Sequence, residues 1–214
     1  DTTKTTAVLF DFDGVVMDTE TQYSIFWHKV GVDYLGMDDL ENRVKGQTLT
    51  YIYDTFFGGK AKEQEEITAA LIRFEQEMDY DYIPGVLDFI ADLRRNHVQM
   101  AVVTSSNDQK MAAVYRARPE VRTMFDRILT AEMFTRSKPA PDCFLLGMVV
   151  FGTTPDTTYV FEDSFNGLKA GMASEATVIG LATTNPRESI APLCHCVLDD
   201  FRGFTYDKML QVHK

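Results

Sequence analysis

Cysteine is scarce in this sequence: the 214 residues include only Cys143, Cys194 and Cys196. An odd and sparse set is typical of reduced thiols and argues against a disulfide framework, which favours a cytoplasmic protein. Cys194 and Cys196 flank His195, but ligands this close do not have zinc spacing, and no second ligand pair follows. We therefore interpret the two thiols as small apolar side chains at the end of a buried strand.

The chain also lacks an excess of positive charge and a long apolar run. It has 21 Lys and Arg against 32 Asp and Glu, a net charge of −11. A field of this sign repels nucleic acid and anionic membranes, so we expect neither as a partner. No stretch is long enough for a membrane span, and no secretory pattern opens the sequence. Phosphorylated substrates are repelled too, so a phosphate site would need a metal ion and local basic groups.

Nucleotide-binding loops are missing as well. There is no G-x-G-x-x-G pattern, and Gly58-Gly59-Lys60 does not have P-loop spacing. We find no internal repeat and no low-complexity tract. Hydrophobic residues make up 45% of the chain. That share fits an ordinary globular core, and the length allows one large domain or two unequal ones.

What is present divides the chain into two patterns. An apolar strand at residues 6–10 is followed by helical periodicity alone, with helices predicted at 20–30, 48–57 and 61–78. From Pro84 onward, strands and helices alternate. Strands are predicted at 98–103, 128–130, 158–161 and 176–181, and helices at 86–95, 108–116, 141–151 and 165–172.

This order predicts an α/β protein with a Rossmann-like parallel sheet core and helices on both faces, because alternating strands and helices form right-handed crossovers. The core would comprise residues 1–17 and 84–214. Residues 18–83 would form an inserted α-helical cap domain. We expect the insertion to lie above the strand ends, where open sheets of this kind bind ligands.

The first apolar strand ends in Asp11-Phe12-Asp13-Gly14. Two carboxylates two residues apart project to the same side of an extended strand. Like charges this close resist joint ionisation unless a cation lies between them, and hard oxygen ligands favour Mg²⁺. The alternative is an acidic corner in which Gly14 makes the turn.

Three more polar segments follow predicted strands or open predicted helices. Residues 104–107, Thr-Ser-Ser-Asn, offer hydroxyls and backbone N–H groups for an anion, or simply a helix cap. In residues 137–142, two prolines follow Lys138 and stiffen the backbone around it, so Lys138 is either a fixed charge or a surface lysine. Residues 162–164, Glu-Asp-Ser, offer a metal ligand and a partner for the lysine, or another helix cap. Together they supply the parts of one phosphoryl-transfer site.

These segments resemble the haloacid dehalogenase (HAD) superfamily of phosphotransferases, in particular its β-phosphoglucomutases and small sugar-phosphate phosphatases with a helical (C1-type) cap. The resemblance covers nearly the whole chain. It rests on DFDGVVMDTE near the start, VVTSSN in the middle, SKPAPD later and VFEDSFNGLKAGMAS near the end. It implies a Rossmann-like core with a helical cap inserted after the first strand.

The resemblance implies a role for each matching side chain. Asp11 corresponds to the nucleophile and Asp13 to the general acid and base. Thr104, with the backbone N–H of Ser105, corresponds to the phosphate-binding group. Lys138 corresponds to the lysine that orders the nucleophile and the phosphate.

The resemblance also implies a Mg²⁺ site. Its ligands would be Asp11, Asp163 and the backbone carbonyl of Asp13. Glu162 would orient Lys138 or ligate through the metal's water shell. The reaction would pass through an aspartyl phosphate, which splits one difficult step into two easier ones.

Two departures favour a phosphatase over a mutase. Leu49 stands where the mutases carry an arginine for the second phosphate, and Tyr23 stands where they carry a histidine. Lys45 or Arg43 could substitute, but a lysine lacks the bidentate fork of arginine. We therefore predict hydrolysis of a small sugar or polyol phosphate, with a β-phosphoglucomutase activity as the alternative. Tyr23, Lys45 and Gln47 are the predicted substrate contacts of the cap.

Other classes fit less well. A dehalogenase has no use for Asp13, and a signalling receiver domain would need no cap and about half this length. A binding or structural module is the remaining alternative, and the absence of any phosphatase activity would revive it. We expect a monomer or weak dimer whose partner is a small phosphorylated metabolite.

Overall fold

The computed structural model describes residues 4–214, which contain a six-stranded, fully parallel sheet. The strand order is β3–β2–β1–β4–β5–β6, so the N-terminal strand is central. The strands are β1 (Ala7–Phe10), β2 (Gln99–Val103), β3 (Arg127–Leu129), β4 (Thr158–Glu162), β5 (Thr177–Leu181) and β6 (Cys196–Leu198). The predicted parallel α/β fold is confirmed.

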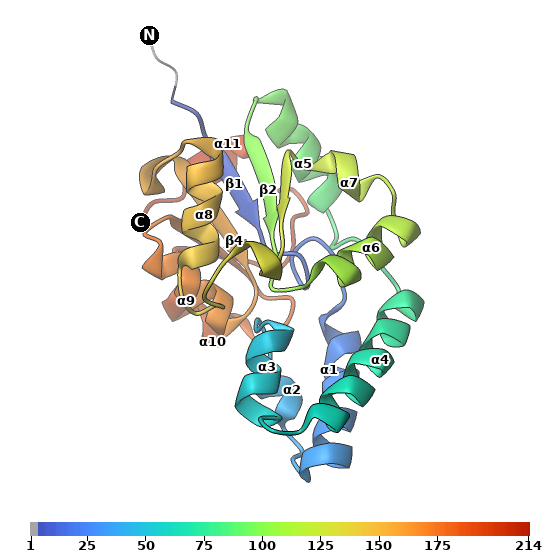
Figure 1. Ribbon diagram of the computed structural model, residues 1–214. Helices are drawn as coiled ribbons and strands as arrows, with labels where there is room; N and C mark the ends of the chain where they lie inside the picture. The colour runs from blue at the N-terminus through green and yellow to red at the C-terminus, as the bar shows by residue number, and fades with distance from the viewer. Residues whose placement is uncertain (1–3) are drawn as a thin grey trace.

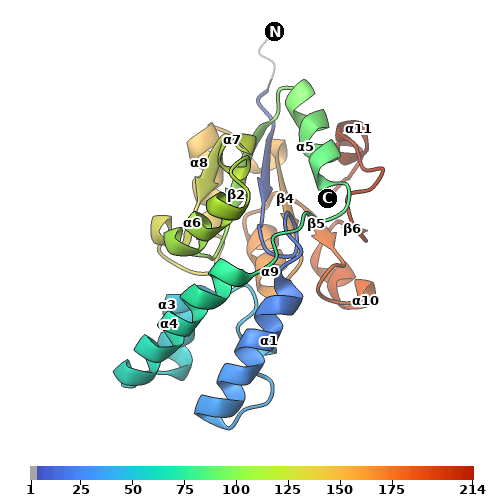
Figure 2. The ribbon, with the colours of Figure 1, turned by 90° about the vertical axis from the view of Figure 1, so that its right-hand side faces the viewer.

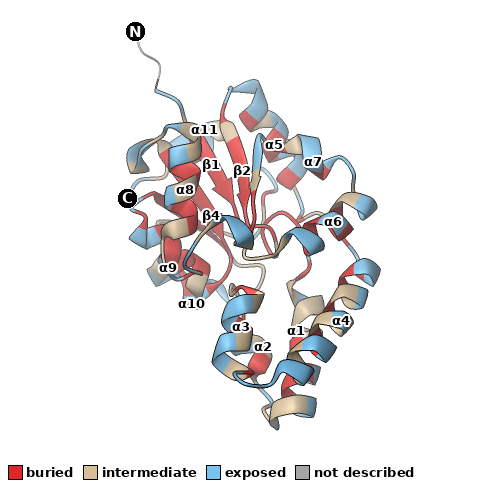
Figure 3. Cartoon of the chain, in the orientation of Figure 1, coloured by how far each residue is buried: buried red, intermediate tan, exposed pale blue. Residues whose placement is uncertain are grey.

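Helices cover both faces of the sheet (Figure 1). Side chains of β1 alternate between two hydrophobic clusters: Val8 and Phe10 belong to one, and Leu9 belongs to the other. The first cluster receives α5 (Val86–Arg95), α6 (Asp108–Ala117), α7 (Val121–Met124) and α11 (Tyr206–Leu210). The second receives α8 (Asp142–Phe151), α9 (Phe165–Ala173) and α10 (Arg187–Ile190). The four inner strands β1, β2, β4 and β5 are accordingly buried on both sides, as Figure 3 shows for β1 and β2.

Between β1 and α5 the chain forms helices only, and we call residues 20–77 the helical insertion. It contains α1 (Glu20–Val30), a π-helical segment (Gly31–Leu35), α2 (Leu40–Arg43), α3 (Leu49–Phe56) and α4 (Ala61–Glu77). Its inward side chains, among them Trp27, Ile52 and Leu71, form a third hydrophobic cluster. The insertion therefore has a small core of its own. Figures 1 and 2 show its helices as a separate group beyond the end of the sheet.

The position of the insertion follows from the strand order. In a sheet of order 3-2-1-4-5-6, the crossovers change direction beside the central strand, and a crevice opens at the carboxyl ends of the strands there. Here that point lies between β1 and β4. The helical insertion begins directly after the turn that follows β1, and Figure 1 shows it below these strand ends.

Several short elements were not predicted. Helices α2, α7, α10 and α11 have only four or five residues, too few for a helical repeat to show in the sequence. Strand β6 begins at Cys196, and the thiols of Cys194 and Cys196 are half-buried rather than fully enclosed.

Among residues 4–214, no helix combines the length and apolar character that crossing a membrane requires.

Candidate active site

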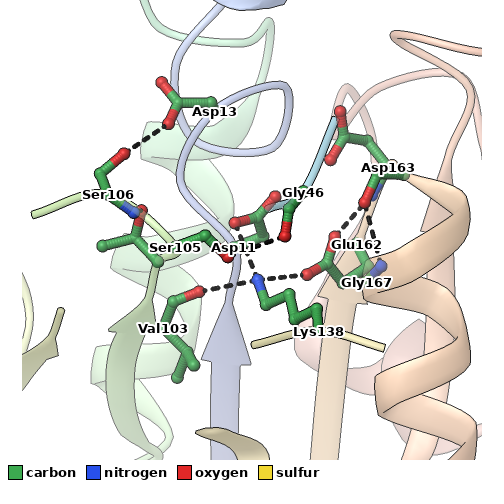
Figure 4. Close-up of polar contacts among 12 residues, drawn as sticks. Asp11, Asp13, Gly46, Val103, Ser105, Ser106, Lys138, Glu162, Asp163 and Gly167 are labelled. Carbon is green, nitrogen blue, oxygen red and sulfur yellow. Dashed lines mark hydrogen bonds and ion pairs between the residues drawn. The ribbon is translucent and has the colours of Figure 1, made fainter. Parts of the chain in front are cut away.

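The turn after β1 separates its two aspartates. Gly14 has a φ of 82°, which a residue with a side chain rarely adopts, and its N–H donates to the Met17 carbonyl at 2.8 Å. A Cβ on Gly14 would also lie 2.0 Å from Oδ2 of Asp163. The turn thus needs glycine for conformation and for space. Asp13 points toward Ser106, away from the cluster around Asp11 (Figure 4).

Lys138 ties three strand ends together. Its side chain is 1% exposed, and its Nζ donates to Asp11 Oδ1 at 3.1 Å, Glu162 Oε1 at 2.6 Å and the Val103 carbonyl at 3.2 Å (Figure 4). Burial lowers the pKa of an ammonium, but the charges of Asp11 and Glu162 outweigh it and raise the pKa of Lys138. Lys138 is therefore a fixed positive charge beside Asp11.

Asp11, Glu162 and Asp163 form a buried acidic cluster in which one carboxylate oxygen of each lies within 4.8 Å of the others. Burial and the charge of Asp11 raise the pKa values of Glu162 and Asp163. A cation among these oxygens would offset the repulsion. The donor set is hard oxygen, as Mg²⁺ prefers, so the residues present fit a divalent ion.

The loop after β5 supports this cluster, and the sequence analysis missed it. Thr184 donates its hydroxyl to Asp163 Oδ2 at 2.5 Å, and Asn185 Nδ2 donates to the Asp163 carbonyl at 3.2 Å. The available signal was that Thr-Thr-Asn follows a buried strand at the same sheet edge.

The loop after β2 is both a helix cap and a polar wall of the site. Asn107 accepts a hydrogen bond from the Lys110 N–H at 2.9 Å and caps α6. The helix cap was one of the two alternatives predicted for residues 104–107. Thr104 is buried and accepts from the Ser106 N–H at 3.0 Å. Thr104 and Ser105 line the same cavity as Asp11.

Asp13 has a lysine of its own, Lys110, which the sequence analysis also missed. Lys110 Nζ donates to both carboxylate oxygens of Asp13, at 2.9 and 2.8 Å. Thr19 donates to Oδ1 at 2.6 Å and Ser106 to Oδ2 at 3.2 Å. The available signal was the position of Lys110 one helical turn before Val114, on the buried face of α6.

A cavity of about 100 Å³ lies between the strand ends and the helical insertion. The three predicted substrate contacts line it, and all three also bond to protein groups, two through their side chains and Lys45 through its backbone. The Tyr23 hydroxyl donates to Glu75 Oε2 at 2.5 Å, and Gln47 Oε1 accepts from the Ser137 hydroxyl at 2.8 Å. The backbone carbonyl of Lys45 accepts from Asn166 Nδ2 at 3.2 Å.

The wall that the insertion contributes is rich in carboxylates. Glu20, Glu41 and Glu75 line the cavity, and Lys45 is the lysine that the insertion places there. Within residues 4–214, Glu41 Oε2 is the buried side-chain polar atom that lacks a hydrogen-bond partner. Desolvation, and then the charges of Asp13 and Asp11, raise the pKa of Glu20 to about 8.

Known proteins share this sequence pattern and fold. The profile of the family described as haloacid dehalogenase-like hydrolase matches residues 8–181. SUPPRESSOR OF QUENCHING 1 of Arabidopsis thaliana is 29% identical over 198 residues, 85% of this chain, but the match spans only 18% of that protein. A phosphorylated carbohydrates phosphatase of Thermotoga maritima is 27% identical, with 78% of this chain and 81% of the relative covered.

A solved structure agrees with the fold. CbbY of Rhodobacter sphaeroides in complex with phosphate superimposes with a TM-score of 0.79 at 22% identity, covering 95% of this chain and 98% of that one. At this identity the likeness shows the fold and nothing finer.

Proposed function

The chain belongs to the haloacid dehalogenase-like hydrolase family, and from this we propose that it hydrolyses a small sugar or polyol phosphate through an aspartyl phosphate. The family match confirms the superfamily that the sequence resembles. One observation carries the proposal: Asp11 bonds a buried lysine and belongs to a buried acidic cluster, at the edge of a cavity lined by Thr104 and Ser105.

Asp11 is the proposed nucleophile. Lys138 holds its carboxylate and places positive charge near the phosphoryl oxygens, where charge is greatest during transfer. The Thr104 hydroxyl and the Ser105 N–H would hold the phosphoryl group. Mg²⁺ would be held by Asp11, Asp163 and the Asp13 carbonyl with Glu162 nearby, and it would supply further positive charge to those oxygens.

Asp13 is the proposed proton carrier. In the first step the bond between phosphorus and the leaving oxygen breaks, an Asp11–phosphorus bond forms, and Asp13 gives its proton to the leaving oxygen. In the second step a water oxygen bonds to phosphorus, the Asp11–phosphorus bond breaks, and Asp13 takes the water's proton. The helical insertion would act as the cap, closing the cavity against bulk water during the first step.

The wall of the cavity favours a phosphatase over a mutase. A mutase must hold a second phosphate, but the insertion presents Leu49 and three glutamates against Lys45. Carboxyl groups accept hydrogen bonds from hydroxyl groups, and those that are ionised repel a second phosphate. We propose that Tyr23, Lys45 and Gln47 contact the hydroxylated leaving group in this cavity.

The test is phosphate release from a panel of hexose, pentose and hexitol phosphates with Mg²⁺, for the wild type and Asp11→Asn. We expect release from several monophosphates by the wild type and none by Asp11→Asn. Asp18→Asn, at an exposed position in the same segment, is the matched control and should retain activity. Normal turnover by Asp11→Asn would remove the covalent mechanism. Interconversion of hexose 1- and 6-phosphates without phosphate release would establish the mutase instead.

A further inference from the structure

Lys110 is a buried charge that the family resemblance does not explain. Its side chain is 1% exposed, in the first turn of α6 on the face that packs against the core. Its Nζ bonds both oxygens of Asp13 and the Ser106 hydroxyl, the latter at 3.1 Å. It also lies 5.0 Å from the Tyr23 ring centre and 5.2 Å from that of Phe12. An ammonium enclosed in this way cannot move to solvent.

The contacts of Lys110 constrain the direction of one carboxyl group. One hydrogen bond to each oxygen fixes the rotation of the Asp13 carboxyl group, which a single hydrogen bond would leave free. Thr19, fully buried and directly before the helical insertion, adds a third donor. Asn107, which caps α6, fixes the backbone of Lys110 in turn. Asn107 thus holds Lys110 in place, and Lys110 holds the carboxyl group of Asp13.

We propose that Lys110 is the positioning residue for Asp13, and that it aims the proton carrier at the leaving oxygen. The inference rests on the proposed function, in which Asp13 gives a proton to that oxygen as its bond to phosphorus breaks. Lys110 gives up no proton in either step. It holds the carboxyl group, while Lys138 does the same for the nucleophile. Each aspartate of the first loop therefore has its own buried lysine.

The experiment compares two substrates of nearly the same shape that differ in their need for a proton. p-Nitrophenolate leaves as a stable anion, whereas phenolate from phenyl phosphate is a poorer leaving group that gains more from protonation. The value of kcat/KM reports the steps up to departure of the leaving group. For Lys110→Met we expect a fall of about 10²-fold with phenyl phosphate and within about threefold with p-nitrophenyl phosphate.

A purely structural role predicts a different result, in which both values fall by the same factor. That outcome would overturn the inference while leaving the proposed function intact. If the wild type released phosphate from neither compound nor from the sugar phosphate panel, the proposed function itself would fail. Lys169→Met, at an exposed lysine of α9, is the matched control and should change neither value.

A second variant guards against misfolding of Lys110→Met, since removal of one partner of a buried ion pair is strongly destabilising. Thr19→Val keeps the ammonium and removes the hydroxyl that donates to Asp13 Oδ1. We expect the same selective loss with phenyl phosphate, reduced to about tenfold. Equal losses with both substrates in Thr19→Val would count against the inference even if Lys110→Met could not be purified.

Discussion

The sheet edge and the helical insertion face each other across one cavity, but their polar groups are satisfied differently. At the sheet edge, Lys138 bonds groups at the ends of three strands. On the insertion, Glu41 keeps a buried oxygen that no group among residues 4–214 bonds, and burial raises the pKa of Glu20 to about 8. The edge holds its geometry before any ligand arrives, as chemistry common to all phosphate esters requires. On the insertion, polar groups remain available to bond the leaving group, which is the part of the substrate that differs between esters.

The largest predicted effect comes from breaking the sheet edge. Lys138→Met leaves the carboxylates of Asp11 and Glu162 buried without their cation. We expect turnover of p-nitrophenyl phosphate to fall by about 10³-fold, because a fixed charge beside the phosphoryl group is lost. The free energy of unfolding should fall by about 3–5 kcal/mol, measured by urea denaturation. An unchanged unfolding midpoint would show that the pair contributes nothing to stability.

The loop after β5 gives a smaller effect at the same edge. Thr184→Val removes the hydroxyl that orients Asp163. We expect a 10–100-fold higher Mg²⁺ concentration for half-maximal activity after the metal has been removed with EDTA, because groups behind a metal ligand set its orientation. Thr183→Val is the matched control, since its hydroxyl bonds the Gly14 carbonyl and no carboxylate. Equal metal dependence in wild type and Thr184→Val would contradict the assignment of Asp163 as a ligand.

Much of the sheet edge could be predicted from the sequence, for a physical reason. Asp11, Thr104 and Asp163 come directly after buried apolar strands, and parallel strands end at a common edge. Local pattern was therefore enough to place them near one another. The order of the strands and the short elements at the chain's end depend on tertiary packing, so local pattern could not predict them.

Other contacts around the cavity were harder to predict because they join segments far apart in the chain. Lys110 meets Asp13 across 97 residues, and Tyr23 meets Glu75 across 52. A lysine or a glutamate on an amphipathic helix is usually solvated, and a place on the apolar face, as Lys110 has, is only a weak sign of an exception. The hydroxyl of Ser105 bonds the Gly46 carbonyl at 2.9 Å, and this distant contact joins the sheet edge to the insertion. These residues could be found only once the helices had been placed.

The smallest predicted effect is a pH dependence that belongs to the insertion wall. Glu20 has a pKa of about 8, so it is mostly neutral at pH 7 and gains a negative charge as the pH rises past that value. An ionised Glu20 repels the phosphate group, so KM for p-nitrophenyl phosphate should rise between pH 7 and pH 9. The rise should be at most about tenfold, which corresponds to 1.4 kcal/mol.

Glu20→Gln isolates this effect, because glutamine keeps the size of the side chain and cannot ionise. In the variant KM should stay level across pH 8, while its value at pH 6.5 stays near that of the wild type. Glu77→Gln, at an exposed position of α4, should follow the wild-type profile. A KM that rises equally in wild type and Glu20→Gln would assign the titration to another group. If KM stays level with pH in Glu20→Gln alone, the ionisation of one insertion residue changes substrate binding, while the chemistry is performed at the sheet edge.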